Sequence, residues 1–257
     1  MGLGSEVEDD MDLVGKRVLV TGGAVRIGRA ICEALARRGC VIVVHYRTSE
    51  QDAQALVAAL RRDGADAVAI ESPLGDEAHC VDLIDAAVRA VGGLDVLVNN
   101  AAVFHKDSLL ETTEAKLRDE VETNAFVPIL LTRAFVGLPR DGHDLLPHGK
   151  VINLLDRRVA GLETGALPYL LSKKMLADFT RIAALELAPA FTVNAVAPGA
   201  ILPPPGKGAE YIHDLAGAMP LKVDLSPEDI AKAVVYLLES DAVTGQTLFV
   251  DGGQHLV

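Results

Sequence analysis

The sequence lacks cysteine pairs, paired histidines and long apolar runs. Its three cysteines, Cys32, Cys40 and Cys80, are an odd number without CxxC spacing, which predicts reduced thiols in a cytoplasmic protein. The seven histidines form no HxH or HxxxH pair, so no metal site is expected. No stretch of about 18 apolar residues occurs, and the N-terminus lacks a basic segment followed by an apolar run. A membrane span and a signal peptide are therefore not expected.

Basic residues are in short supply as well. The chain has 24 Lys and Arg against 36 Asp and Glu, which gives a formal net charge of −12 and a pI of about 5.0. Nucleic acids and anionic membranes bind basic surfaces, so neither is an expected partner. The segment EVEDDMD carries part of the negative charge, and residues 1–12 are expected to be a disordered acidic tail. Half of the residues are apolar, so 13–257 can bury a sizeable core and is expected to form one domain.

Apolar runs and helical periodicity alternate along the whole chain. Strands are predicted within 16–23, 40–46, 65–71, 94–102, 149–155, 191–199 and 245–253. Helices are predicted at 26–39, 50–64, 76–93, 113–135, 166–189 and 226–240. The strands are continuous apolar runs, which is typical of a parallel sheet covered on both faces. The expected fold is α/β: one Rossmann-like, doubly wound, parallel seven-stranded sheet with helices on both faces.

The segment VTGGAVRIG connects the first predicted strand to the first helix. Gly22, Gly23 and Gly28 permit a tight turn, in which backbone N–H groups can approach a diphosphate at the helix N-terminus. The spacing is not a strict GxGxxG, because Arg26 stands where a third glycine could be. At the first strand-to-helix turn of a doubly wound sheet, this segment predicts a dinucleotide site.

The second predicted strand ends in HYRTS, residues 45–49. NAD-binding folds usually carry Asp or Glu at this place, where it holds the ribose 2′-hydroxyl, but here no acid occurs before Glu50. Arg47, with the hydroxyls of Thr48 and Ser49, suits a 2′-phosphate instead. The segment favours NADP(H), although a solvated arginine in a loop is the alternative interpretation.

These segments together resemble the short-chain dehydrogenase/reductase family from Leu13 to Val257. The resemblance rests on the glycine turn, NNAA at 99–102, Asn124, Tyr169 with Lys173, PG at 198–199 and GQTLFVDGG near the C-terminus. It implies NADPH/NADP+ as cofactor and the following contacts to it: Gly22, Arg26, Ile27, Gly28, His45, Tyr46, Arg47, Thr48, Ser49, Leu74, Asn100, Ala101, Tyr169, Lys173, Pro198 and Gly199.

The resemblance also implies catalytic roles. Tyr169 matches the family's proton donor, and Asn124 matches the residue that supports a proton-relay water. Lys173 lies one helical turn beyond Tyr169 on the same face, so its ammonium can lower the pKa of the phenol and hold the nicotinamide ribose. Without this context, Tyr169 and Lys173 could be an ordinary surface pair.

Asp156 departs from the general family pattern, which has serine thirteen residues before the tyrosine. An ionised carboxylate only accepts hydrogen bonds and repels a developing oxyanion, so it suits a substrate with N–H donors. If burial raised its pKa, Asp156 could relay a proton itself.

The pteridine reductase and dihydromonapterin reductase branch of the family carries such an aspartate. The chain resembles this branch in Arg26, in HYRTS and in Phe104, whose ring is expected to stack on a pterin or else to be plain core. The predicted substrate residues are Phe104, Asp156, Tyr169, Arg26 and Leu202.

Other residues differ from that branch. Ala102 replaces a serine beside the cofactor, and Pro73 stands where the family often has Asp against the adenine. The segment ILPPPGKG, residues 201–208, has no counterpart and is expected to form a stiff wall of the substrate site.

Three functions remain open at this stage. The first is an NADPH-dependent reductase of a pterin-like (dihydropterin or dihydrofolate) small molecule, and the second is a reductase of 3-oxoacyl or small ketone substrates. The third is a non-catalytic NADP(H)-binding sensor or scaffold. The family resemblance also implies a homotetramer or a homodimer that pairs the helices at about 113–135 and 167–187.

Overall fold

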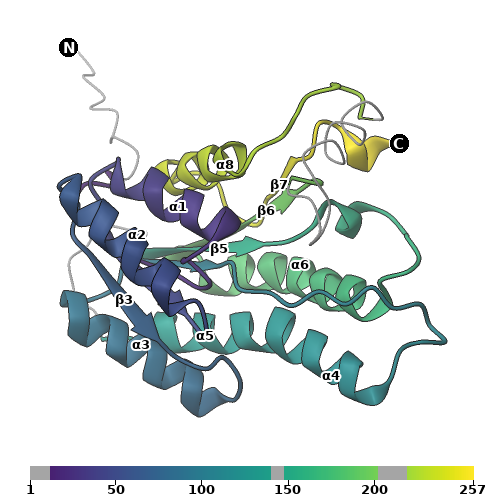
Figure 1. Ribbon diagram of the computed structural model, residues 1–257, viewed down its shortest axis with the longest axis horizontal. Helices are drawn as coiled ribbons and strands as arrows, with labels where there is room; N and C mark the ends of the chain where they lie inside the picture. Colours follow the sequence, from purple (N-terminus) through teal and green to yellow (C-terminus); the bar gives the residue numbers. More distant parts are fainter. Residues whose placement is uncertain (1–11, 140–147, 202–218) are drawn as a thin grey trace, which may run out of the picture.

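The computed structural model describes residues 12–139, 148–201 and 219–257, which form a seven-stranded parallel sheet between two helical layers (Figure 1). The strand order is β3-β2-β1-β4-β5-β6-β7, so the expected α/β fold class is confirmed. The strands are β1 (Arg17–Val20), β2 (Val41–Tyr46), β3 (Ala67–Glu71), β4 (Val96–Asn99), β5 (Gly149–Leu154), β6 (Phe191–Pro198) and β7 (Thr247–Val250). The order reverses between β1 and β4, where the strands' carboxyl ends open a crevice.

Helices cover both faces of the sheet (Figure 1). One face carries α1 (Arg26–Ala36), α2 (Glu50–Arg62) and α8 (Pro227–Glu239). The other face carries α3 (Glu77–Val91), α4 (Glu114–Val121), α5 (Val127–Val136) and α6 (Leu167–Leu187). Two short 3₁₀ turns complete the described elements: η2 (Arg157–Ala160) and η3 (Gln254–Leu256).

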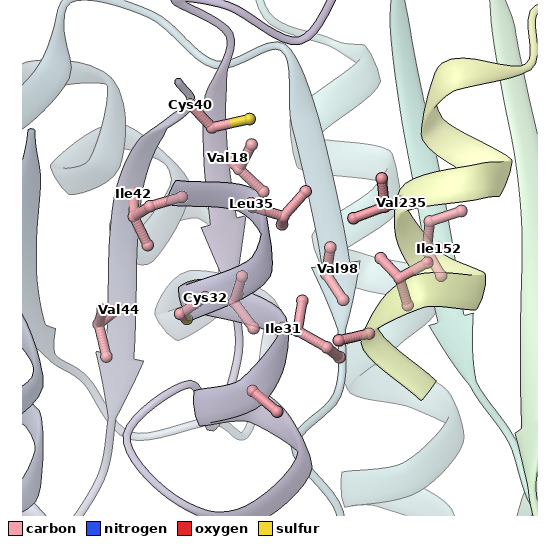
Figure 2. Packing of buried hydrophobic residues seen from close by; sticks show 14 of the residues in the cluster. Val18, Ile31, Cys32, Leu35, Cys40, Ile42, Val44, Val98, Ile152 and Val235 are labelled. Carbon is pink, nitrogen blue, oxygen red and sulfur yellow. The ribbon is translucent and has the colours of Figure 1, made fainter. Parts of the chain in front are cut away.

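The alternation of side chains along each strand supplies both layers of the core. Val18 and Val20 of β1 pack in the cluster under α1, α2 and α8, whereas Leu19 between them packs in the cluster under α3, α5 and α6. Figure 2 shows the first of these clusters, with Ile31 and Leu35 of α1 directed at the strands. Both faces of a central strand are therefore buried, which explains why apolar residues dominate these strands.

The predicted single helix at 113–135 is interrupted. Thr113 caps α4 by accepting a hydrogen bond from the N–H of Lys116, but α4 ends at Val121 and a π-helical turn, η1 (Glu122–Phe126), precedes α5. The interruption was not predicted, because α4, η1 and α5 follow one another directly and all three are helical. Such turns often occur at functional sites, and this one contains Asn124.

Three sequence expectations lie mostly outside the described residues. The acidic tail was placed at 1–12, of which only Asp12 is described. Leu202 and the predicted wall of the substrate site at 201–208, apart from its first residue, belong to the segment 202–218. Within the described part of the chain, no helix is long and apolar enough to cross a membrane.

Candidate active site

A cavity of about 330 Å³ opens at the carboxyl ends of β1, β2 and β4, where the strand order reverses. It brings together twelve of the residues predicted to bind the cofactor. These are Gly22, Arg26, Ile27, Gly28, His45, Tyr46, Arg47, Thr48, Ser49, Leu74, Asn100 and Ala101. Ala102, which the sequence analysis placed beside the cofactor, also lines the cavity, and four further lining residues were not assigned to this site: Ala24, Val25, Val103 and Thr123.

The glycine turn has no room for side chains at its closest contact. A Cβ on Gly28 would lie 2.2 Å from the carbonyl oxygen of Gly22, so α1 can start this close to the turn only with glycine. Gly22 has φ +60°, and Arg26 has φ +54° in the left-handed region that glycine adopts most readily. Arg26 thus adopts the backbone conformation of the glycine that the motif lacks, at a cost in strain.

Two polar side chains hold the glycine turn from the strands. The amide of Asn100 donates to the carbonyl oxygens of Thr21, at 2.8 Å, and Gly22, at 3.1 Å. The hydroxyl of Thr21 accepts from the N–H groups of Asn100, at 2.9 Å, and Ala101, at 3.0 Å. Thr21 and Asn100, which follow β1 and β4, therefore fix the shape of the glycine turn.

His45, which also lines the cavity, holds the glycine turn from the end of β2. Its Nδ1 accepts from the N–H of Gly22 at 3.0 Å, which places the proton on Nε2, 3.0 Å from the carbonyl oxygen of Ser72. Burial lowers the pKa of His45 to about 4, so the ring is neutral at neutral pH. Both ring nitrogens are already paired, and His45 therefore positions the glycine turn instead of contributing a charge for a phosphate.

Arg47 and Thr48 are exposed at the rim of the cavity, and Ser49 is half-buried beside them. No carboxylate lines the cavity among the described residues. This arrangement leaves a guanidinium and two hydroxyls as the polar groups at the end of β2.

Asp156 and Tyr169 meet across the end of β5. The hydroxyl of Tyr169 donates to Oδ2 of Asp156 at 3.3 Å, and Oδ1 accepts from the N–H of Arg158 at 2.9 Å. The guanidinium of Arg158 lies 3.6 Å from Oδ2. Burial, and secondly the charge of Asp156, raise the pKa of Tyr169 well above its usual value, so the phenol keeps its proton.

Lys173 lies one turn further along α6 and is buried. Its Nζ donates to the carbonyl oxygen of Leu154 at 2.7 Å and lies 5.8 Å from the centre of the Tyr169 ring. Burial lowers the pKa of Lys173 to about 8, while the charges of Asp156 and Glu120 oppose that change. The acid, the phenol and the amine thus lie in one site.

Phe104 is half exposed next to this group, with its ring edge-on to Tyr169 at 4.8 Å between centroids. The guanidinium of Arg158 lies 5.7 Å from the centre of the Phe104 ring. Phe104 is therefore accessible, and the alternative of a plain core residue does not describe it. Sequence reasoning missed Arg158, which contacts both Phe104 and Asp156.

Asn124 in the π-helical turn directs its amide at the segment after β4. Its Oδ1 accepts from the N–H of Val103 and its Nδ2 donates to the carbonyl oxygen of Val103, both at 2.9 Å. The amide also contacts Ser172 of α6, at 3.1 Å, and Glu120 of α4, at 2.6 Å. Glu120 and Ser172 are two more residues that sequence reasoning missed.

Pro198 and Gly199 lie at the end of β6 and do not line the cavity. Gly199 donates from its N–H to the carbonyl oxygen of Val250, and a Cβ there would lie 2.8 Å from the Cα of Asp251. The glycine is needed for this close approach to the segment after β7. Tyr169 and Lys173 also lie outside the cavity lining. The predicted phosphate-binding residues therefore line the cavity, and the predicted catalytic residues lie in a separate region.

A doubly wound sheet with a cavity at the reversal point and a tyrosine–lysine pair beside it defines a nucleotide-dependent oxidoreductase class. A family model described as enoyl-(acyl carrier protein) reductase matches residues 23–255. The chain is 33% identical to the 3-oxoacyl-[acyl-carrier-protein] reductase FabG of Staphylococcus aureus, over 94% of this chain and 98% of that protein. The chain belongs to the short-chain dehydrogenase/reductase family and is an oxidoreductase of that type.

Solved structures of similar proteins include two that were determined in complex with NADP. FolM alternative dihydrofolate reductase 1 from Brucella canis is 32% identical, with a TM-score of 0.88 and 96% of each chain covered. A short chain dehydrogenase from Burkholderia cenocepacia is 31% identical, with a TM-score of 0.84, and covers 95% of this chain and 99% of that one.

Proposed function

We propose that this chain is an NADPH-dependent reductase of a pterin-like substrate, a dihydropterin or dihydrofolate. The observation that carries the proposal is Asp156, whose carboxylate lies 3.3 Å from the hydroxyl of Tyr169, the residue that the accessible ring of Phe104 contacts. The similarity to FolM alternative dihydrofolate reductase 1 from Brucella canis supports it.

The cavity residues fit the two phosphate-bearing parts of NADPH. The glycine turn, closed to any Cβ at Gly28, leaves backbone space for the diphosphate at the N-terminus of α1. Arg47, Thr48 and Ser49 would bind the 2′-phosphate, because the lining offers it a cation and hydroxyls without a competing carboxylate. NADPH, when bound, supplies the hydride.

The proton comes from the chain's own residues. Tyr169 stays protonated and donates through its hydroxyl, and Lys173 one turn away places an ammonium where it stabilises the phenolate that remains. Asp156 accepts hydrogen bonds and is held by Arg158, so it can anchor an N–H group of the substrate.

A flat ring with N–H donors fits this arrangement better than a simple ketone does. A carboxylate at position 156 repels the oxyanion that develops when a ketone is reduced. The exposed ring of Phe104 provides a face for a heteroaromatic ring, and the guanidinium of Arg158 lies near it. Among the proposed substrate residues, Arg26 lies on the cofactor side of the site and Leu202 is outside the described residues.

A second candidate is reduction of a 3-oxoacyl or small ketone substrate. The 33% identity to FabG from Staphylococcus aureus and the enoyl-(acyl carrier protein) reductase family model favour it. In that case Asp156 would be a substitution that the reaction tolerates.

Two variants of one residue separate these functions. Asp156→Asn is expected to lower dihydropterin turnover by about tenfold or more, the loss expected when a charge-assisted hydrogen bond is removed, with little change in NADPH affinity. Asp156→Ser is also expected to turn dihydropterins over slowly, as Asp156→Asn does, but to retain or gain activity on ketones. A panel of dihydropterins, dihydrofolate and 3-oxoacyl esters, followed by NADPH fluorescence, measures both. Unchanged dihydropterin turnover in Asp156→Asn contradicts the proposal, and tight NADPH binding without turnover of any substrate favours a sensor.

We also propose that the chain assembles into a homotetramer or a homodimer through the layer of α4, the π-helical turn and α6. Several large apolar side chains are exposed on these elements: Leu117, Phe126, Leu171, Met175, Ile182 and Leu185. Such a patch needs a cover in water, and gel filtration with light scattering tests the proposal. A monomer at micromolar concentration contradicts it.

A further inference from the structure

Glu120 is a fully buried carboxylate that no step of the proposed reaction uses. It lies in the last turn of α4, four residues before Asn124, and its side chain has no exposed surface. A buried carboxylate is costly unless hydrogen-bond donors surround it. The position of this residue beside the π-helical turn therefore requires an explanation.

Two N–H donors and a histidine ring nitrogen converge on this carboxylate. Oε2 accepts from Nδ2 of Asn124 at 2.6 Å. Oε1 accepts from the backbone N–H of His105 and faces Nδ1 of the same residue at 3.1 Å. Glu120 thus joins the π-helical turn to the residue that follows Phe104, and the amide of Asn124 continues the connection to Ser172 of α6, next to Lys173.

We propose that Glu120 is a positioning residue of the active site, which holds the Phe104 segment and Asn124 in place and supplies a buried negative charge behind the catalytic helix. This inference rests on the proposed function, since it assigns Glu120 to the same site. The positioning role follows from the hydrogen bonds alone. One carboxylate connects the loop after β4 to the π-helical turn and, through Asn124, to α6.

The charge of Glu120 acts in a defined electrostatic setting. Burial raises the pKa of Glu120, whereas its hydrogen bonds from His105 and Asn124 oppose that change and favour the ionised form. The charge acts on Tyr169 and Lys173 and raises the pKa of each. The charged or titratable groups that face these residues from the neighbouring elements are His105, Asp119, Asp156 and Arg158.

Glu120→Gln is the direct test, because it removes the charge and keeps the shape. An amide nitrogen at position 120 must face a donor of either His105 or Asn124, so one of the two connections is lost. The ¹³Cε resonance of Lys173, assigned by Lys173→Arg, is followed against pH in the chain without cofactor. Its midpoint is expected to move to lower pH in Glu120→Gln, since the ammonium loses a stabilising negative charge.

Kinetics supply the second readout. In Glu120→Gln, kcat/KM is expected to fall about tenfold to a hundredfold, the loss for an unpaired charge-assisted hydrogen bond. In the pH profile of kcat/KM, the decline at high pH is expected to shift together with the titration midpoint of Lys173. A merely structural role would lower kcat/KM equally at every pH. NADPH affinity is expected to stay unchanged, because Glu120 does not line the cavity.

Asp119→Asn is the matched control. Asp119 is the adjacent residue, about half exposed, and its Oδ2 lies 3.8 Å from Nδ1 of His105. Removing this carboxylate is expected to leave the Lys173 midpoint unchanged, because solvent screens an exposed charge. An equal change in both variants, or no change in Glu120→Gln, overturns the proposal.

A second variant guards against misfolding, which thermal melting detects. Glu120→Asp keeps the charge but shortens the reach, so KM for the substrate is expected to rise while the Lys173 midpoint stays near that of the wild type. Wild-type KM in Glu120→Asp overturns the positioning role. The Lys173 titration needs no substrate, so it decides whether the Glu120 charge acts on Lys173 even if none of the proposed substrates is turned over.

Discussion

Gly28→Ala tests whether the cavity at the carboxyl ends of β1, β2 and β4 binds the dinucleotide. The added Cβ would lie 2.2 Å from the carbonyl oxygen of Gly22 and 2.6 Å from Nδ2 of Asn100. Contacts this short cannot persist, so the turn must move away from α1. Inserting one methyl group into a closely packed place costs about 1–3 kcal/mol.

The same displacement is expected to weaken NADPH binding. If the substitution destabilises the NADPH complex by about 1.4 kcal/mol more than it destabilises the free protein, the affinity for NADPH drops about tenfold. Fluorescence titration with NADPH measures the dissociation constant, and thermal melting measures the cost to the free protein. The hydrogen bonds of Asn100 to Thr21 and Gly22 are expected to be lost together with the native shape of the turn.

Gly161→Ala is the control for this experiment. A Cβ on Gly161 meets no atom within 4 Å, and the residue does not have a positive φ, so neither NADPH affinity nor melting temperature should change. If Gly28→Ala binds NADPH as tightly as Gly161→Ala does, the diphosphate does not lie on the glycine turn and the assignment of the cavity is wrong.

Three further predictions concern charge and pH. Arg47→Ala is expected to weaken NADPH binding about tenfold and to leave NADH binding unchanged; equal losses for both nucleotides would refute a 2′-phosphate contact. Reduction needs the ammonium form of Lys173, whose pKa is about 8, so kcat/KM is expected to fall as pH rises through that value. A profile that stays flat there excludes this role. The folded-state pKa of His45 is lowered from 6.5 to about 4, so its neutral form contributes stability above pH 6.5 that is lost as pH falls towards 4, about 3 kcal/mol in total. In urea unfolding, His45→Gln should lose less stability over that range than the wild type, and equal losses would contradict the assignment.

Local sequence features carried most of the fold prediction. Each central strand is buried on both faces, so its composition alone marks it as a strand of a covered parallel sheet. Ser226 and Asp229 form the capping box at the start of α8, and Ser226 could be predicted as its cap because capping depends on residues three positions apart. Tyr169 and Lys173 share a helix face for the same local reason.

The errors arose where distant segments meet. His45 was expected among the cofactor contacts, but the pairing of its ring nitrogens with Gly22 and Ser72, 23 and 27 residues away, was not predicted. Glu120 looked like one of many charged residues on a helix, and only the packing of α4 against α6 and the loop after β4 buries it. The π-helical turn at Asn124 was missed because α4, the π turn and α5 follow one another without a break and the whole stretch was taken as one helix.

The sequence by itself determined the order of strands and helices, the glycine turn and the spacing of the tyrosine and the lysine, because each depends on neighbours within a few residues. Only the tertiary structure decided which charges are buried and which atoms meet. The 3.3 Å contact between Asp156 and Tyr169 requires α6 to pack against β5, and the burial of Glu120 requires α4 to pack against α6. Burial and proximity across the chain, which set the charge state of each group, are properties of the assembled fold.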